Sequence, residues 1–491
     1  MNGKQLTKLN ISVSLLHQLI TGICAIVLPR FILAQFGSEV NGLMQSVSQI
    51  LSYTTLMEMG IGGVVLASLY KPLAENNTAE ISNVFNTTKS FFGKISAVFV
   101  VFALVLSLVA KFVVHSEFDF IYVSTMVIIL AVNTFFNYYF GLPHQLLLKA
   151  DRRLYVVQSV QIVTTVLNLS VCLVAIKMNA SIHMVKLLSA FVFILNPVCY
   201  RLYIKKHYEI VPTKEKHPLA QKKDAVIHHL AYFIHRNTDI VIISVFSTLS
   251  AVSVYSVYNS VILIIENLLN AISAGVAGTI GNRIAKGEKK SITESFELYE
   301  GVNTCLTAAI FTVAAIMILP FVRIYTLGVT DAEYIQPVFA CVMLLAGVMY
   351  SIRIPYGSII SAAGHYKETR TGAILEVCLN LVISILLVKP LGISGVAIGT
   401  FVAMTYRTIY MVWYLSKNIL HRPVLKFVKS FGVNMVVGIV LLCLSERFLT
   451  IEAESLLSLV PYGIGVSAVV FGALAIVNII TNYDLIKKIR R

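Results

Sequence analysis

The sequence is poor in charged residues and in long polar stretches. Only 13% of its 491 residues are Asp, Glu, Lys or Arg, whereas a soluble domain contains about 25%. Hydrophobic residues make up 57% of the chain, and the mean hydropathy is +0.81. The longest polar stretch is the short segment 205–224. No soluble domain of ordinary size is therefore expected, and the chain is predicted to lie in a membrane.

Sequence signatures of enzymes and metal sites are also missing. The chain has no GxxxxGK[ST] phosphate loop, no HExxH and no GxSxG, so neither a nucleotide-driven motor nor catalysis is expected. Its seven cysteines all fall in apolar stretches, without CxxC or Cys/His spacing. This pattern indicates neither a metal site nor a disulfide framework. The apolar run 9–34 is too long for a signal peptide and lacks a cleavage site, so it is interpreted as a retained span.

What the sequence has instead is a series of apolar runs long enough to cross a bilayer, which takes about 20 residues each. They predict an all-α polytopic membrane protein with about 14 transmembrane helices. The predicted spans are 9–34, 40–69, 91–111, 120–147, 155–176, 183–204, 225–248, 251–278, 295–322, 335–361, 371–388, 392–415, 430–449 and 456–480.

The distribution of basic residues predicts the orientation in the membrane. The net charge is +15, and most of the 39 Lys and Arg residues lie near the N-terminus, in the even-numbered connections and in the C-terminal tail. Such residues favour the cytoplasmic side. Both termini are therefore expected in the cytoplasm. Because the basic residues are scattered over short loops, nucleic-acid binding is not expected.

An ungapped shift of 212 residues relates the two halves of the chain. It maps the first six spans onto the next six with the same direction across the membrane, and matched positions include Pro143 with Pro355 and Asn168 with Asn380. A parallel repeat of six plus six spans is a known transporter architecture. The predicted parts are a first lobe at 1–204, a linker at 205–224, a second lobe at 225–417, and a final helix pair with a basic tail at 418–491. The segment 71–90 is predicted to be an amphipathic elbow lying at the membrane surface.

The span at 225–248 carries an unusual polar stripe. At about 100° per residue, its polar side chains fall within an arc of roughly 120°. Charges in a span are costly unless they face water or a partner within a bundle. We therefore expect this helix to line a central, mostly cationic cavity. The stripe consists of His228, His229, Tyr232, His235, Arg236 and Asp239.

Other spans add ionisable residues to the candidate site. Arginine offers a planar fork of donors that suits phosphate oxygens, and buried acids could take up a coupling ion, H⁺ or Na⁺. The alternatives without a transport role are headgroup contacts near span ends for Arg30, Arg353 and Glu376. For Arg236, Asp239 and Glu266 the alternative is a structural ion-pair network within the bundle. The candidate cavity residues are Arg236, His235, Arg407, Arg353, Arg30 and His17, and the candidate ion-coupling or ion-pairing residues are Asp239, Glu266 and Glu58.

Four segments carry a resemblance to a known family. They are 28–75 (LPRFILAQFGSEVNGLMQSVSQILSYTTLMEMGIGGVVLASLYKPLAE), 231–261 (AYFIHRNTDIVIISVFSTLSAVSVYSVYNSV), 351–376 (SIRIPYGSIISAAGHYKETRTGAILE) and 395–420 (GVAIGTFVAMTYRTIYMVWYLSKNIL). They resemble Wzx-like polysaccharide flippases of the polysaccharide transporter family, in the MATE-like multidrug/oligosaccharidyl-lipid/polysaccharide exporter (MOP) superfamily.

The resemblance implies a bundle of two lobes that moves a lipid-linked oligosaccharide across the cytoplasmic membrane by alternating access. The cargo would be an undecaprenyl-diphosphate-linked repeat unit for capsule, O-antigen or exopolysaccharide synthesis. Membrane lipids and the polymerase and glycosyltransferases of the same pathway would be its partners. The family has no strict catalytic motif to transfer, so the site residues above rest on their place in the spans alone.

Three other functions stay open at this point. A MATE-type drug antiporter should prefer acids and aromatic residues to arginines in its cavity. A flippase for lipid II or teichoic acid precursors would differ only in the glycan it carries. A membrane-embedded polysaccharide polymerase tends to present a large extracytoplasmic loop, and none of that size is predicted here.

Overall fold

The computed structural model describes residues 3–58, 61–114, 116–212, 223–285 and 289–481. Throughout these ranges the regular structure is helical and contains no strand, so the predicted all-α class is confirmed. The helices are α1 Gly3–Ser52, α2 Ile61–Ala74, α3 Thr78–Val113, α4 Phe120–Phe136, α5 Leu142–Ala150, α6 Leu154–Lys177, α7 Ile182–His207, α8 Lys223–Phe246, α9 Leu249–Ala285, α10 Lys289–Tyr325, α11 Pro337–Ala362, α12 Tyr366–Asn418, α13 Leu425–Phe448 and α14 Leu456–Thr481. A 3₁₀ turn, η1 Tyr53–Glu58, follows α1, and a π-helical turn, η2 Asn137–Gly141, joins α4 to α5.

Most of these helices are long and apolar enough to cross a membrane. Within the described ranges, 11 helical stretches meet that condition, and the chain is a multi-pass membrane protein. One of them, α12, holds the two predicted spans 371–388 and 392–415, which are separated by the non-helical Gly392 (φ 57°). In α1 the non-helical Gly37 (φ 81°) separates the first predicted span, 9–34, from the start of the second, 40–69, which continues past α1 into η1 and α2. Positive φ values suit glycine, which has no Cβ. The helix α8, which carries the polar stripe, is not among the 11.

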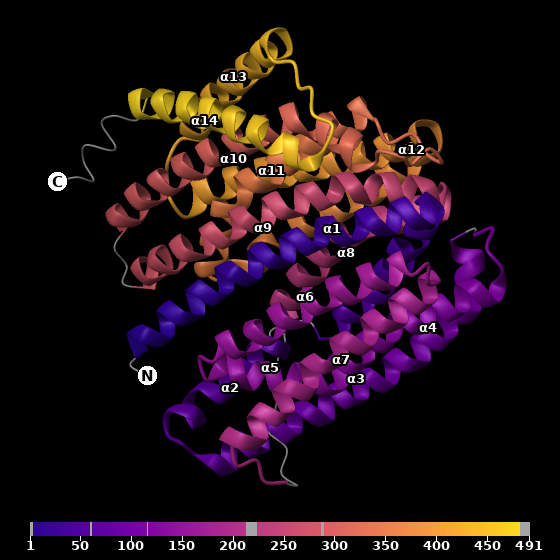
Figure 1. Cartoon of the computed structure of the whole chain (residues 1–491). Helices are drawn as coiled ribbons and strands as arrows, with labels where there is room; N and C mark the ends of the chain where they lie inside the picture. The colour runs from indigo at the N-terminus through magenta and orange to yellow at the C-terminus, as the bar shows by residue number, and fades with distance from the viewer. Residues whose placement is uncertain (1–2, 59–60, 115, 213–222, 286–288, 482–491) are drawn as a thin grey trace. The chain divides into compact units, whose positions relative to one another are not determined.

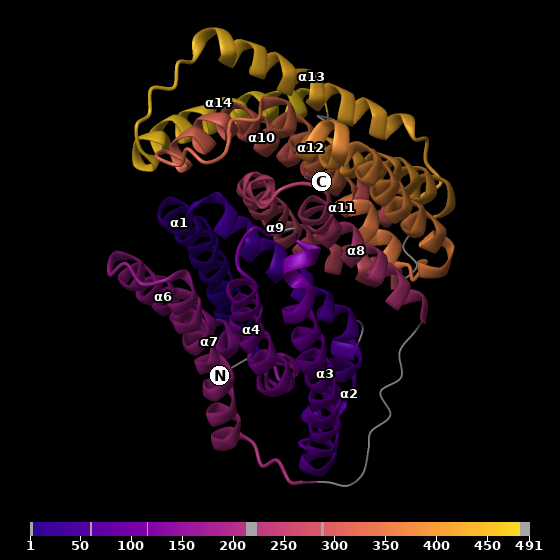
Figure 2. The same ribbon diagram turned by 90° about the vertical axis from the view of Figure 1, so that its right-hand side faces the viewer.

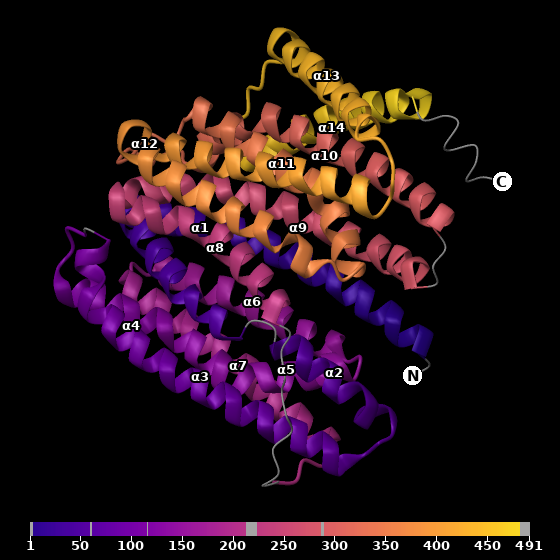
Figure 3. The same cartoon turned by 180° about the vertical axis from the view of Figure 1, so that it is seen from behind.

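The chain divides into two compact units. The first unit comprises 1–233 and 248–253, and the second comprises 234–247 and 254–491. In the first unit α4 packs against α3 and α7, and α6 packs against α1 and α7 (Figure 1 and, from behind, Figure 3). In the second unit α11 packs against α10 and α12, while α13 and α14 pack on α10 (Figure 2).

The helix boundaries repeat along the chain with the predicted offset of 212 residues. The kink at Gly37 corresponds to Leu249, the first residue of α9. Further boundaries coincide at the ends of α3 and α10 (Val113, Tyr325), at the ends of α5 and α11 (Ala150, Ala362) and at the starts of α6 and α12 (Leu154, Tyr366). The helices α13 and α14 lie beyond the repeat, as expected for an added pair.

The segment 71–90 contains the turn between the end of α2 and the start of α3. Residues from Thr78 onward belong to α3, which is capped by Asn77, whose side chain accepts a hydrogen bond from the Glu80 backbone amide (3.1 Å). The apolar side chains Val84 and Phe85 are buried in a cluster with residues of α2 and α5. Protein therefore covers part of the apolar face of this segment, whose location at the membrane surface stays a prediction.

Candidate functional site

The second unit contains a cluster of buried charges from α8, α9, α11 and α12. On α8, Arg236 forms an ion pair with Glu266 of α9. The Glu266 side chain is 1% exposed and the Arg236 side chain 18%. A buried carboxylate of this kind is stable only with a partner. Arg236 therefore compensates Glu266 while keeping part of its own surface accessible.

An aromatic ring connects this pair to the next one. The guanidinium carbons of Arg236 and Arg353 each lie 5.2 Å from the ring centroid of Tyr350 on α11. Stacking of this kind stabilises a guanidinium. The Tyr350 hydroxyl accepts a hydrogen bond from Asn270 Nδ2 (3.2 Å). The tyrosine is thus held in place between two arginines of different helices.

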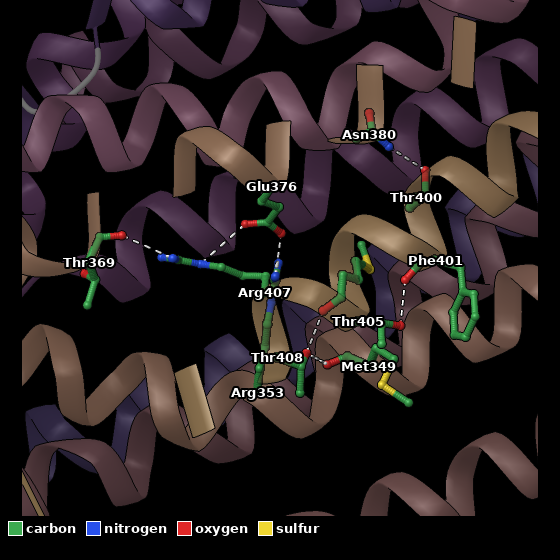
Figure 4. Close-up of polar contacts among 11 residues, drawn as sticks. Met349, Arg353, Thr369, Glu376, Asn380, Thr400, Phe401, Thr405, Arg407 and Thr408 are labelled. Carbon is green, nitrogen blue, oxygen red and sulfur yellow. Dashed lines mark hydrogen bonds and ion pairs between the residues drawn. The ribbon is translucent and has the colours of Figure 1, made fainter. Parts of the chain in front are cut away.

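A second group of charges is formed by two arginines that share one carboxylate. Glu376 of α12 forms ion pairs with Arg353 of α11 and with Arg407 of the second half of α12, where Nε lies 3.5 Å from Oε2 (Figure 4). Arg407 also donates from Nη1 to the Thr369 carbonyl (3.1 Å). The charged side chains are between 3% and 8% exposed. This group joins α11 to both halves of α12.

The carboxylate of Asp239 accepts hydrogen bonds from side chains of α9 and of both halves of α12. It accepts hydrogen bonds from the Thr400 hydroxyl (2.7 Å), the Tyr255 hydroxyl (2.9 Å) and Asn380 Nδ2 (3.4 Å). Asn380 also donates to Thr400 (2.9 Å; Figure 4). The Asn380 Oδ1 atom is buried and has no hydrogen-bond partner among the described residues. Oxygen ligands of this kind suit hard cations, so this group of residues could hold a small cation or a proton.

Two glycines allow the halves of α12 to approach and so build the Asp239 group. After the reversal at Gly392, Gly395 and Gly399 face the first half of the helix. A Cβ on Gly399 would lie 2.2 Å from Ser384 Oγ, and one on Gly395 would lie 2.1 Å from the Leu387 carbonyl oxygen. Glycines four residues apart permit such close packing between membrane helices. Thr400, next in sequence to Gly399, is thereby brought against Asn380.

The structure brings together five of the residues selected from the sequence. Arg236, Arg353, Arg407, Asp239 and Glu266 all lie in the second unit. Each of these arginines has a carboxylate partner, and with Glu376 the three arginines are matched by three acids. The cluster is therefore close to neutral rather than strongly cationic, as the ion-pair alternative predicts.

The other selected residues lie elsewhere. His17 and Arg30 are on α1 of the first unit, both half-buried, and His17 Nε2 lies 3.4 Å from Thr21 Oγ1. Five side chains of the stripe and the candidate site lie outside the described part of the structure, namely those of His228, His229, Tyr232, His235 and Glu58.

Sequence reasoning missed several residues of this cluster. Tyr255, Tyr350, Asn380 and Thr400 contact the charged groups directly but were not among the selected residues. The signal that could have found Thr400 is the GxxxG spacing of 395–399 immediately before it.

Comparison with solved structures identifies the fold. A structure of the "Lipid II flippase MurJ, inward closed conformation" is similar with a TM-score of 0.74 and 13% identity, covering 97% of this chain and 99% of that one. The chain therefore has the same fold as this flippase structure. An inward-facing multidrug resistance MATE family transporter of the MOP superfamily matches with a TM-score of 0.61 at 9% identity, covering 87% of this chain and 96% of its own. A mutant of the Vibrio cholerae MATE transporter VcmN matches with a TM-score of 0.60 at 14% identity, over 86% and 98%.

The sequence comparisons are less informative. No protein-family model and no curated protein matches the sequence. The MATE-like fold predicted from the sequence is confirmed by the structural neighbours, which are transporters and a flippase rather than enzymes.

Proposed function

We propose that this protein is a flippase that moves a polyprenyl-diphosphate-linked oligosaccharide across the bacterial cytoplasmic membrane by alternating access. The sequence resemblance to Wzx-like flippases supports the substrate class, and the MATE-like fold supports the transport mechanism. Both termini would lie in the cytoplasm, where the basic loops place them. The repeat unit would be destined for capsule, O-antigen or exopolysaccharide.

The single observation that carries the proposal is the extent of the structural similarity. The lipid II flippase matches 97% of the chain, whereas the MATE transporters match 86% or 87% although nearly all of their own length is covered. The part of this chain that the MATE structures do not match is similar in length to the segment 418–491, which contains α13 and α14. A helix plan shared over its full length with a lipid flippase favours a lipid-linked cargo over a water-soluble drug. Lipid II itself is the second candidate, supported by the same similarity.

Among the three paired arginines, Arg236 is the one suited to contact the head group. Its side chain is 18% exposed, against 8% for Arg353 and 3% for Arg407. An arginine that is held by a carboxylate and a tyrosine face loses little further freedom when it binds phosphate oxygens. We assign Arg353 and Arg407 to holding α11 and α12 together.

For the coupling ion, the proposal centres on Asp239. Its hydroxyl and amide neighbours can supply further oxygen ligands, and Asn380 Oδ1 is a buried acceptor without a partner among the described residues. Either Na⁺ or H⁺ bound there would contact the carboxylate together with these oxygen groups. Asp239→Asn should abolish the dependence of transport on the ion gradient, whereas Glu368→Gln on the exposed surface of α12 should not. Transport by the wild type that ignores both gradients would refute the coupling role.

The decisive experiment is the extraction of lipid-linked oligosaccharides from cells depleted of the protein, scored for the membrane face that holds them. Complete single repeat units on the cytoplasmic face would support the flippase. Single units on the outer face would point to a polymerase. Accumulated lipid II would identify the second candidate, and drug sensitivity without any accumulation would favour an antiporter.

A further inference from the structure

A polar cavity lies in the second unit, where the start of α13 and the end of α14 meet α10. Its volume is about 220 Å³, which is below the range of roughly 300–1,000 Å³ typical of drug-sized ligands. A small head group would fit it better. The lining residues are Glu297, Glu300, Gly301, Arg422, Lys426, Lys429, Ser430, Val433, Asn434, Asn478 and Thr481.

The acids of the cavity are already neutralised. Arg422 donates from Nη1 and Nη2 to the two oxygens of Glu300 (2.7 and 2.5 Å), and the Tyr356 hydroxyl also bonds that carboxylate. Lys426 donates to Glu297 (2.5 Å). Burial lowers the pKa of Arg422, but the hydrogen bond to Glu300 and its charge outweigh this and raise the pKa above its usual value. Arg422 therefore stays charged, and both acid–base pairs are balanced.

Among the described lining residues, one positive charge and two buried polar atoms are left without a partner. Arg422 Nε and Ser430 Oγ are buried and have no hydrogen-bond partner among the described residues, and the Arg422 side chain is only 3% exposed. Buried donors without a partner are rare and call for a ligand. Lys429, exposed at the rim, supplies the excess charge.

From this arrangement we infer that the cavity binds a phosphodiester monoanion, the head group of an anionic phospholipid. The N–H of Arg422 Nε, the Ser430 hydroxyl and the Lys429 ammonium would each donate to its oxygens, and one excess positive charge matches one phosphodiester. Exposed apolar side chains next to the cavity suit the acyl chains of a lipid rather than free phosphate. They are Leu425 and Val428 on α13 and Ile479 and Ile480 on α14.

This site differs from the proposed transport site in both place and residues. It involves α10, α13, α14 and the connection between α12 and α13, whereas the charges assigned to transport, Arg236 and Asp239, lie on α8. A bound lipid would contact α13, α14 and α10 together, and would so stabilise the packing of the added helix pair on the repeat. The inference stands independently of which substrate is transported.

The test uses the full-length protein in detergent, titrated with phosphatidylglycerol, phosphatidylcholine or inorganic phosphate. Native mass spectrometry counts bound lipid, and thermal unfolding reports its stabilising effect. We expect phosphatidylglycerol to bind at least about tenfold more tightly than phosphatidylcholine, and Ser430→Leu or Lys429→Ala to remove about that factor, since a charge-assisted hydrogen bond is lost. Lys94→Ala, at an exposed lysine of α3, is the matched control and should bind as the wild type does.

Three results would overturn the inference. Equal affinity for the two lipids would exclude charge recognition, and unchanged binding by both variants would place the lipid elsewhere. Protection by inorganic phosphate as strong as that by phosphatidylglycerol would exclude a lipid as the source of the phosphate group. Lys429→Ala keeps the test meaningful if Ser430→Leu fails to fold, because Lys429 is exposed.

Discussion

Removing the carboxylate of Glu376 should destabilise the second unit severely. Glu376 is the shared partner of Arg353 and Arg407, whose side chains are 8% and 3% exposed. In Glu376→Gln both ion pairs are lost and two buried positive charges are left facing a neutral amide. Breaking a buried pair by removing one partner costs about 3–5 kcal/mol. With about 2–4 °C per kcal/mol for a domain of this size, the midpoint of thermal unfolding should fall by roughly 10 °C.

The assay is thermal unfolding of the purified protein in detergent, with Glu368→Gln as the control. Glu368 is an exposed glutamate near the start of the same helix. The triple variant Arg353→Met, Glu376→Leu, Arg407→Met should regain most of the lost stability, because a buried ion-pair group can be replaced by apolar side chains of similar size. An unfolding midpoint of Glu376→Gln equal to that of the wild type would refute the buried network. A triple variant that is stable but inactive in export would show that these arginines also bind substrate.

Three further predictions concern other parts of the chain. Arg236→Lys keeps a positive charge beside Glu266 but loses the planar fork, so export should fall about tenfold with unchanged protein levels in the membrane; normal export would remove Arg236 from the substrate site. Gly399→Ala should lower the free energy of unfolding by about 1–3 kcal/mol, because the added Cβ would lie 2.2 Å from a side-chain oxygen. Gly22→Ala is the control, because a Cβ there meets nothing within 4 Å. Arg153→Ala should cost less than about 1 kcal/mol, because its pair with Asp151 (2.7 Å) is 33% and 27% exposed; a loss as large as that of Glu376→Gln would contradict the ranking by burial.

Much of the fold could be predicted because the length of each apolar run, and the offset between corresponding runs of the two halves, can be read directly from the sequence. The spans, the repeat and the added pair all follow from apolar runs and their spacing. At 71–90 the amphipathic pattern reveals an apolar face but not what covers it. In the structure Val84 and Phe85 pack against α2 and α5 instead of lipid.

The partners of the buried charges could not be predicted in the same way. Arg236 meets Glu266 at a separation of 30 positions along the chain, and Arg353 meets Glu376 at 23. Such pairings depend on which faces of two helices meet, and a single sequence does not fix the rotation of each helix. The neighbours of Asp239 depend in addition on the reversal of α12 at Gly392, which places Thr400 beside Asn380.

The coincidence of helix boundaries at 212 residues has a consequence for the origin of the charges. Positions that correspond to Arg236, Glu266, Arg353, Glu376 and Arg407 in the first half are Cys24, Thr54, Gly141, Thr164 and Leu195. None of these is ionisable at neutral pH except, weakly, the cysteine. A duplicated ancestor would thus have two copies of one helix plan, only one of which bears charges at these positions today. A gene assembled from two copies of the first half would encode the same order of helices without these charges. A gene assembled from two copies of the second half would encode each of these ion pairs twice.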